Sequence, residues 1–257
     1  MKHPLRTLLL AVCCGLAAAC TQRQERLKLM SYNIRNGIGI DNIQDIGRIA
    51  RVILREAPDL VALQELDSAT LRVDGRYIPG ELGRMTGMHA TFGRAIGFAG
   101  GSYGIGLLSR TEPLAVRSIP LPGREEARVL LMAEFPDYTV CITHLSLTPE
   151  DRLASLPIIR EATDTCRKPV LLAGDFNTGD AAAVLAGLGG GFRILSDTTR
   201  MTFPSDNPAV RIDYILGRGL PTSATVAESA VDHTATASDH CPLWVTLVWK
   251  RGKQPGK

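Results

Sequence analysis

Asp175 and Asn177 place a carboxylate and a carboxamide two positions apart in the segment Gly174–Asn177. The apolar run Pro169–Ala173 leads into this segment and has the length and composition of a buried strand. Residues 178–180 follow with the pattern that opens a helix. Open α/β sheets usually carry their chemistry at the carboxyl ends of such strands, so the segment is a candidate catalytic site. The alternative is a turn that only caps the next helix.

Similar polar side chains accompany other apolar runs of the chain. The set contains four carboxylates, two carboxamides and two histidines: Asn33, Glu65, His144, Asp175, Asn177, Asp213, Asp239 and His240. Asp239-His240 precedes its apolar run, and the other residues follow theirs. Buried carboxylates without partners are costly, so we expect them to share a cation. Oxygen ligands suit Mg²⁺ or Mn²⁺ better than zinc, and histidine can move a proton or position a phosphate oxygen near neutral pH.

The elements that must position these residues follow from hydrophobic periodicity and turn signals. We expect strands over residues 27–33, 60–63, 89–92, 103–109, 114–119, 128–135, 138–145, 169–173, 212–216, 222–226 and 243–249. We expect helices over residues 42–56, 78–86 and 148–166, and a further one after residue 180. Asn42 is the expected cap of the first helix, and Thr148 with Pro149 opens the third, in which Pro157 predicts a kink. Pro136-Asp137 predicts a hairpin turn.

Composition is that of an ordinary globular protein. The chain has 257 residues, of which 45% are hydrophobic and 21% charged, with a formal net charge of +3. This length is enough for one large domain. The net charge is too small to argue for nucleic acid, since a dedicated DNA-binding protein would be expected to show a basic stripe. Beyond residue 20 the cysteines are Cys141, Cys166 and Cys241, which allow at most one bridge and show no CxxC spacing.

Residues 1–19 have the pattern of an export signal, with Lys2 and Arg6 ahead of an apolar run that ends in small residues before Cys20. This resembles a bacterial lipoprotein site at which Cys20 is lipidated and anchors the protein in the cell envelope; a plain secreted protein is the alternative. We expect a tether over residues 20–26, one domain over 27–249 and a basic tail over 250–257. Residues 1–19 hold two of the 29 basic residues and none of the 26 acidic ones, so the rest of the chain is near neutral.

Seven short motifs, in order along nearly the whole exported chain, resemble those of the endonuclease/exonuclease/phosphatase superfamily. They are Ser31–Gly37, Leu63–Asp67, Tyr103–Arg110, Thr143–Leu145, Gly174–Asn177, Arg211–Tyr214 and Ser238–His240. The resemblance implies a four-layer α/β sandwich, with two packed, mostly antiparallel sheets flanked by helices. It also implies Mg²⁺-dependent cleavage of a phosphoester.

The resemblance carries roles to single residues. Glu65 resembles the main metal ligand with Asp239 beside it, and Asn33 a second metal-side or phosphate contact. Asp213 resembles the carboxylate that orients His240, which would contact the scissile phosphate or move a proton. Asp175 and Asn177 resemble the pair that positions the attacking water and the phosphate, and His144 stands opposite His240. Arg72 and Tyr103 resemble substrate-side positions. The implied mechanism is in-line attack by water without a covalent enzyme intermediate.

Two alternatives belong to other functional classes. Gly100–Gly104 matches G-x-S-x-G, which would make Ser102 the nucleophile of a serine esterase, although the pattern lacks the expected strand before and helix after the serine. A lipoprotein that binds ligand without turnover is the second alternative.

The near-neutral charge favours a small phosphodiester, a phosphomonoester or a phospholipid headgroup over nucleic acid, since nucleases need a surface that follows the phosphate backbone. A nuclease and a sphingomyelinase-like enzyme remain open as alternatives within the family. We expect the membrane, reached through lipidated Cys20, as a partner, and no protein partner is implied.

Overall fold

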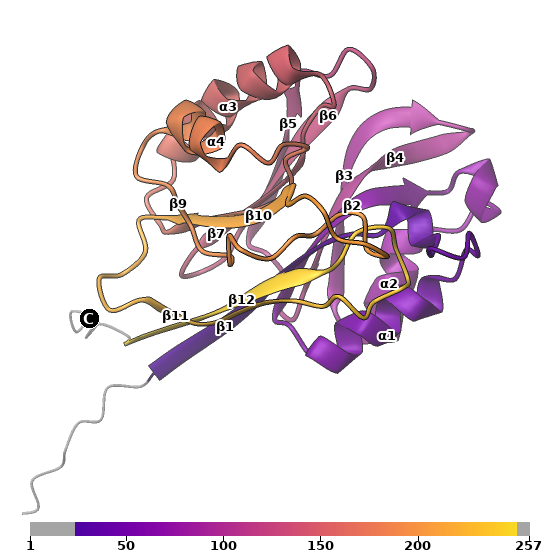
Figure 1. The fold of residues 1–257 in the computed structure, drawn as a ribbon, viewed down its shortest axis with the longest axis horizontal. Helices are drawn as coiled ribbons and strands as arrows, with labels where there is room; N and C mark the ends of the chain where they lie inside the picture. The colour runs from indigo at the N-terminus through magenta and orange to yellow at the C-terminus, as the bar shows by residue number, and fades with distance from the viewer. Residues whose placement is uncertain (1–23, 251–257) are drawn as a thin grey trace, which may run out of the picture.

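The computed structural model describes residues 24–250 as two six-stranded sheets packed face to face and covered by helices on both outer sides (Figure 1). The first sheet has the order β11-β12-β1-β2-β4-β3 and the second β5-β6-β7-β8-β10-β9. Each sheet contains one parallel pair, β1 with β2 and β7 with β8, and is otherwise antiparallel. The predicted four-layer α/β sandwich is therefore confirmed.

The strands of the first sheet are β1 (Gln24–Asn33), β2 (Leu60–Ser68), β3 (His89–Phe98), β4 (Gly101–Ser109), β11 (Thr225–Val231) and β12 (Leu243–Lys250). Those of the second are β5 (Ala115–Leu121), β6 (Arg128–Glu134), β7 (Thr139–His144), β8 (Val170–Asp175), β9 (Arg193–Ile194) and β10 (Asp213–Arg218). The α-helices are α1 (Ile46–Glu56), α2 (Ile78–Thr86), α3 (Pro149–Asp164) and α4 (Ala181–Leu188), with 3₁₀ turns at Arg35–Gly37 and Leu71–Val73.

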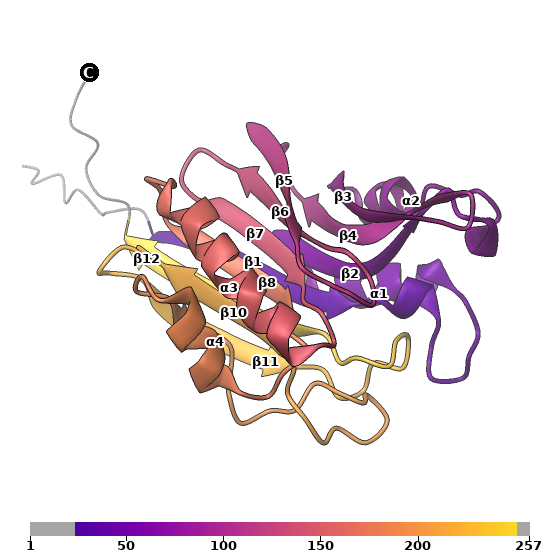
Figure 2. The same ribbon diagram turned by 90° about the horizontal axis from the view of Figure 1, so that it is seen from above.

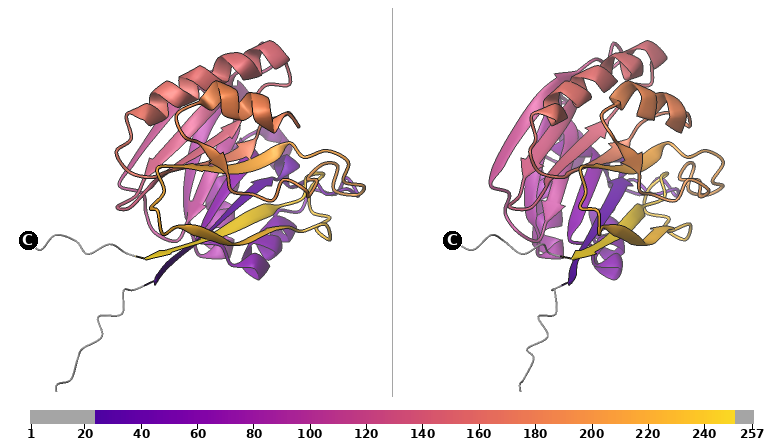
Figure 3. Two further views of the ribbon diagram at one scale, coloured as in Figure 1. Left: turned by 60° about the vertical axis from the view of Figure 1, so that its left-hand side comes forward. Right: turned by 90° about the vertical axis from the view of Figure 1, so that its left-hand side faces the viewer.

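The hydrophobic core has three parts, one between each pair of layers. Side chains such as Leu29, Leu131 and Ile142 fill the space between the two sheets. Ile49 and Ile53 of α1 pack on the outer face of the first sheet, and Leu156 and Ile159 of α3 contribute to the corresponding layer on the second. Figures 2 and 3 show α3 and α4 on one outer side and α1 and α2 on the other. Strands that are buried on both faces read as continuous apolar runs, which is why β8 and the end of β1 were recognisable from sequence.

Several predicted boundaries are wrong. β1 begins at Gln24, three residues inside the predicted tether, because Gln24–Arg26 pair with the end of β12. β2 does not end at residue 63 but continues to Ser68, and β11 spans residues 225–231 rather than 222–226. The two-residue strand β9 was not predicted.

The helix starts also differ from expectation. Asp45, not Asn42, is the N-cap residue of α1, while Asn42 lies in the preceding loop with a positive φ of 59°. Thr148 precedes α3 as predicted, but its hydroxyl donates to Glu125 instead of capping the helix. α3 continues through Pro157, and Asp180 caps α4 by accepting from the backbone N–H of Ala183 at 2.9 Å.

The predicted signal segment, Cys20 and most of the tail lie outside the described residues. Within residues 24–250, no helix is long and apolar enough to cross a lipid bilayer. The three cysteines of this part of the chain are unpaired.

Candidate active site

The register of the second sheet places three of the predicted residues side by side. At the end of β8, Asp175 pairs with His144 of parallel β7 on one side and with Asp213 of antiparallel β10 on the other. A Cβ at the preceding Gly174 would lie 2.0 Å from the carbonyl oxygen of Thr143, so glycine is required for this close pairing. The row His144–Asp175–Asp213 therefore follows from the order of three strands.

After β8 the chain turns in a way that fixes Asn177. The Asp175 carboxylate accepts from the backbone N–H of Asn177 at 2.8 Å, and Asn177 adopts a positive φ of 50°. The side-chain amide of Asn177 donates to the carbonyl of Leu145, also at 2.8 Å. The predicted turn therefore does more than cap α4, because it ties the end of β8 to the loop that follows His144.

Glu65 reaches the site through a bulge in β2. The pairing of β2 with β4 shifts between Leu63 and Leu66, and Glu65 itself has a φ of 57°, which a non-glycine residue seldom adopts. Such bulges redirect side chains next to functional sites. The bulge also explains why β2 continues past the point at which polar residues predicted its end.

His240 is held by residues of both sheets. Its Nδ1 lies 3.0 Å from Oδ2 of Asp213, and its ring packs on Phe203 with the centroids 4.8 Å apart. The loop before β12 is fixed by the Ser238 hydroxyl, which donates to the carbonyl of Asn33 at 2.7 Å. Asp213 therefore lies where it can orient the imidazole, as the resemblance implied.

Asn33 joins the two halves of the site. Its amide nitrogen lies 3.0 Å from Oε1 of Glu65, 3.1 Å from Oδ2 of Asp175 and 3.5 Å from Nε2 of His240. The nearest of these residues in sequence is 32 positions away. Asp175 lies at the centre of this arrangement, 3.6 Å from Nε2 of His144 and 3.7 Å from Nε2 of His240.

Near neutral pH one histidine of the site is positively charged and the other is neutral. Burial opposes protonation of His240, but Asp213, Asp175 and Asp239 outweigh it and raise its pKa to about 10. Burial lowers the pKa of His144 to about 4; nearby Asp175 opposes this shift, and the positive charges of Arg128 and His240 add to it. His240 is thus a proton donor and cation, and His144 a neutral ring.

The carboxylates of the site repel one another. Burial raises the pKa of Glu65, and Asp239 and Asp175 raise it further, while the hydrogen bond from Asn33 lowers it. Burial and Asp213 likewise raise the pKa of Asp175. Oδ1 of Asp213 is buried and has no hydrogen-bond partner among the described residues. A divalent cation would relieve such repulsion, so the donor set fits one.

Two groups of residues could hold that cation. Ligand atoms of Asp175, Asp213 and His240 lie within 4.8 Å of one another, but His240 and Asp213 already use Nδ1 and Oδ2 to contact each other. Glu65 and Asp239 are the alternative pair, and the side chains of both line one cleft. Oδ2 of Asp239 lies 3.5 Å from Nε of Arg35. Carboxylate oxygens with water are the ligands that Mg²⁺ prefers, which favours Glu65 and Asp239.

Seven of the predicted residues line a cleft of about 400 Å³, whereas Asn33 and Asp213 lie outside its lining. Its lining includes Glu65, His144, Asp175, Asn177, Asp239 and His240, together with the predicted substrate-side residue Tyr103. Sequence reasoning missed Glu126, Arg128, Leu147, Phe203 and Ile212, which line it as well. Glu126 precedes the predicted strand over residues 128–135, and Arg128 is its first residue. Charged residues at the start of an apolar run were the sequence feature that could have indicated them.

Arg72 lies beside the cleft rather than in its lining. Its guanidinium donates to buried Asp67 at 2.8 Å and to Asn36 at 2.7 Å, and it lies over the rings of Phe98 and Tyr103. These contacts show that Arg72 holds the loop after β1 and supports Tyr103 from outside the cleft.

Ser102 does not occupy a nucleophile elbow. It lies inside β4, where it pairs with Ser68 of β2 and Gly97 of β3, and no helix follows it. The geometry that a serine hydrolase needs is absent at this position in the described chain.

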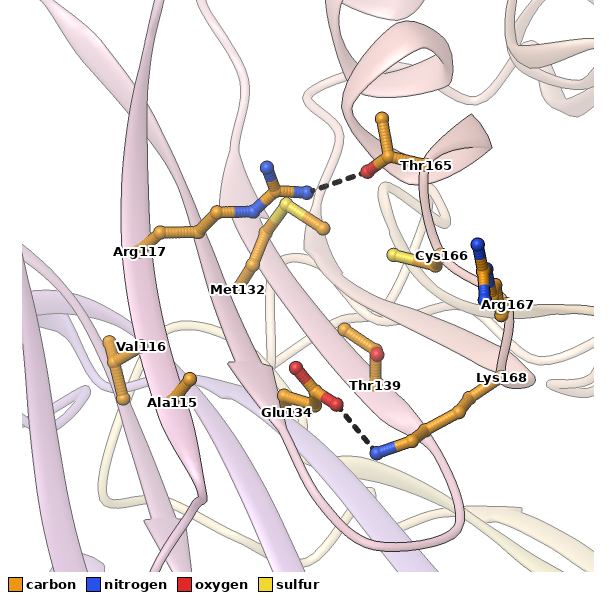
Figure 4. Close-up of a pocket in the computed structure, with 10 residues that line it drawn as sticks. All are labelled: Ala115, Val116, Arg117, Met132, Glu134, Thr139, Thr165, Cys166, Arg167 and Lys168. Atoms are coloured by element: carbon orange, nitrogen blue, oxygen red, sulfur yellow. Dashed lines mark hydrogen bonds and ion pairs between the residues drawn. The ribbon is translucent and has the colours of Figure 1, made fainter.

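A larger cavity of about 490 Å³ lies elsewhere, next to edge strand β5 and the end of α3 (Figure 4). Its acidic residue Glu134 pairs with Lys168 at 2.6 Å, and Arg117 contacts Thr165 at 3.2 Å. Because its one carboxylate is already paired and its described lining holds no cluster of carboxylates and histidines, the candidate chemistry belongs to the smaller polar cleft.

Comparison with known structures gives fold-level neighbours over most of the chain. An endonuclease/exonuclease/phosphatase from Beutenbergia cavernae is 24% identical, with a TM-score of 0.69 over 88% of this chain and 72% of its own. A mannosyl-6-phosphatase of Bacteroides thetaiotaomicron is 19% identical, with a TM-score of 0.68 over 86% and 99%. A humanized D. rerio TDP2 is 21% identical, with a TM-score of 0.66 over 86% and 98%.

No curated protein matches the chain. The family model for the endonuclease/exonuclease/phosphatase family matches residues 30–240, which span every predicted catalytic, metal and substrate-binding residue but not Cys20. The chain therefore belongs to the endonuclease/exonuclease/phosphatase family, a family of phosphoester hydrolases.

Proposed function

We propose that this protein is an exported enzyme that uses Mg²⁺ to hydrolyse a small phosphoester in the cleft around Asp175. The observation that carries the proposal is the contact of one asparagine, Asn33, with Glu65, Asp175 and His240. Asn33 thereby links carboxylates that could bind a cation to a positively charged histidine. Four carboxylates line the cleft, those of Glu65, Glu126, Asp175 and Asp239, and they would repel an anionic substrate unless a cation neutralised them.

Glu65 and Asp239 would hold the cation, which supplies charge neutralisation for the phosphate oxygens when bound. His240, charged and held by Asp213, donates a hydrogen bond to a phosphate oxygen, where negative charge increases in the transition state. Neutral His144 lies on the other side of Asp175 and can donate a second hydrogen bond.

Asp175 and Asn177 position the attacking water. Water oxygen forms a bond to phosphorus as the bond to the leaving alcohol oxygen breaks, and Asp175 accepts the proton that water loses. The leaving oxygen receives a proton from solvent or from the cleft. Neither serine nor cysteine lines the described cleft, and burial raises the pKa of its one phenol, Tyr103, which disfavours a phenolate nucleophile. Direct attack by water is therefore the mechanism that we propose, as the family resemblance implies.

A small substrate is supported by the limited cleft and the near-neutral charge of the exported chain. One structural neighbour is by its name a mannosyl-6-phosphatase, which makes a phosphomonoester one substrate class to test first. A phosphodiester and a phospholipid headgroup are the others. Export, with attachment to the cell envelope through Cys20, rests on the pattern of residues 1–20.

A nucleic-acid substrate is the second candidate, because one neighbour of this fold is a D. rerio TDP2 complexed with a single-strand DNA product. A single-stranded oligonucleotide with a labelled end tests it directly, and cleavage faster than that of any small phosphoester would favour this candidate.

The metal assignment is tested with Glu65→Gln, which keeps the size of the side chain and removes its charge. We expect Mg²⁺ binding, measured by calorimetry, to weaken by about tenfold or more and turnover to fall with it. Glu81→Gln is the matched control, because Glu81 lies on α2 and pairs with Arg76 on the surface. Mg²⁺ binding and turnover that match the control would remove Glu65 from the metal site.

A further inference from the structure

One wall of the cleft is formed by a buried arginine between two carboxylates. Arg128 opens β6, its side chain is only 6% exposed, and it lines the cleft together with His144. Its Nη1 lies 2.9 Å from Oε1 of Glu126, and its Nη2 lies 3.4 Å from Oε1 of Glu125. A guanidinium in this position is the strongest fixed positive charge that the described cleft lining presents, apart from the charged histidine.

Glu125 belongs to the framework of the wall. Its carboxylate accepts from the Ser146 hydroxyl at 2.7 Å, from the backbone N–H of Leu147 at 2.7 Å and from the Thr148 hydroxyl at 3.1 Å. Although partial burial opposes ionisation, these donors lower the pKa of Glu125 to about 2. Glu125 therefore holds the loop after His144 and keeps one side of Arg128 in place.

Glu126 is bound much less firmly. Among residues 24–250, the ion pair with Arg128 is the direct contact recorded for its carboxylate. Its side chain is 26% exposed and lines the cleft, and burial raises its pKa. Moving Glu126 away from Arg128 breaks a single ion pair, whereas moving Glu125 would break its contacts with four residues, Ser146, Leu147, Thr148 and Arg128.

Arg128 also has unused hydrogen-bonding capacity. Its Nε is buried and has no partner among the described residues. Guanidinium groups bind phosphate oxygens through two adjacent N–H groups. Arg128 and its partner Glu126 both line the cleft, so a ligand in the cleft can compete with Glu126 for the guanidinium.

We propose that Arg128 binds an anionic phosphate oxygen of the substrate and that Glu126 is an internal competitor, which occupies Arg128 until the substrate displaces it. The inference rests on the proposed function and extends it with a substrate-binding residue and a built-in control of affinity. Exchange of one anion for another keeps the buried guanidinium paired throughout, so binding avoids the cost of an unpaired buried charge. A neutral ligand offers no such exchange.

The test is a double-mutant cycle on residues 21–257, with inorganic phosphate in the presence of Mg²⁺ as the ligand and calorimetry as the measurement. Glu126→Gln should tighten phosphate binding about threefold or more, because the competitor loses its charge. Arg128→Gln should weaken binding about tenfold or more, because a charge-assisted hydrogen bond is lost. In the double variant, the gain from Glu126→Gln should disappear.

Two further variants keep the result interpretable. Glu134→Gln lies on the same strand and also removes an acid paired with a cation, Lys168, but far from the cleft lining, so it should leave binding unchanged. Arg128→Lys retains the charge, and it should bind phosphate between wild type and Arg128→Gln if the guanidinium geometry matters.

The inference is overturned if wild type does not bind phosphate, if Arg128→Gln and Arg128→Lys both bind it like wild type, or if Glu126→Gln helps equally in the Arg128→Gln background. The last result would make Glu126 a remote negative charge with no competition for Arg128. Turnover of a chromogenic phosphoester by wild type is measured in parallel. Coupled phosphate binding without turnover would refute the hydrolase function while supporting the role of Arg128.

Discussion

Replacing Asp213 by asparagine removes one charge from the site and leaves its shape almost unchanged. Oδ2 of Asp213 lies 3.0 Å from Nδ1 of His240, and both side chains are buried. An asparagine oxygen can still accept from Nδ1–H, so the imidazole can keep its orientation. The change therefore isolates the electrostatic part of the interaction.

The expected magnitude follows from that hydrogen bond. A hydrogen bond to a charged group contributes about 1.5–3 kcal/mol, which corresponds to about one to two pKa units. In the metal-free protein the pKa of His240 is about 10. We therefore expect it to fall to about 8–9 in Asp213→Asn, still above neutral pH because Asp175 and Asp239 remain. Turnover at neutral pH should fall about 10- to 100-fold, as the loss of charge stabilisation is passed to the transition state.

Two assays read the change separately. Nuclear magnetic resonance of the histidine rings, with chelator present, gives the pKa of His240, and steady-state kinetics with Mg²⁺ gives turnover. Asp197→Asn is the control, because Asp197 is an acid of the loop before β10 whose carboxylate accepts from Thr199 and pairs with Arg200, away from the cleft lining. If Asp213→Asn shows the same His240 pKa and the same turnover as this control, Asp213 does not act through His240.

Other predictions follow from the same structure. In the metal-free protein, thermal stability should fall as pH rises from about 6.5 to 10, because folded His240 keeps a proton that the unfolded chain releases; His240→Asn should flatten that slope in a thermal melt. Asp175→Asn should lower turnover by orders of magnitude with little change in melting temperature, and wild-type rates would remove it from the mechanism. Gly174→Ala should cost about 3 kcal/mol or more in a denaturant titration, since its Cβ would meet the Thr143 carbonyl at 2.0 Å; a cost below about 1 kcal/mol would show that β7 and β8 can separate. Cys20→Ser should release the protein from the membrane fraction of the producing bacterium, and unchanged fractionation would contradict lipidation.

Much of the site was accessible from sequence because its residues lie at the ends of apolar runs. Asp175 with Asn177, and Asp239 with His240, are close pairs within single motifs, so their proximity required no knowledge of the fold. Apolar runs and turn signals predicted most of the strands and the four helices, since burial on both faces makes the central strands continuous in hydrophobicity. The arrangement of these strands in two packed sheets was an implication of the family resemblance.

The parts that sequence reasoning missed depend on pairing between distant segments. Glu65 itself was predicted, but the bulge that turns it into the cleft appears only when β2 pairs with β4, and no glycine marks its positive φ. A second register shift, between Val226 and Glu228, accompanies the displaced start of β11. Local propensity carries no information about such shifts.

Arg128 and Glu126 show the same limit for the cleft wall. Before the fold is known, an arginine at the start of a strand is expected to be exposed to solvent, because charged residues are seldom fully buried. Its burial depends on Glu125, which also binds the loop after β7, and on the packing of the two sheets against each other. Side chains that become buried through such tertiary contacts are identified by structure and not by pattern.

The central claim is that this cleft hydrolyses phosphoesters with a bound divalent cation. The most direct test is turnover by residues 21–257 on a panel that contains a phosphomonoester, a phosphodiester, sphingomyelin, a single-stranded oligonucleotide and a carboxylic ester, first with Mg²⁺ and then with excess chelator. The account predicts release from at least one phosphate substrate that chelator abolishes and added Mg²⁺ restores. Phosphate release that resists chelator, or cleavage of the carboxylic ester alone, would contradict it.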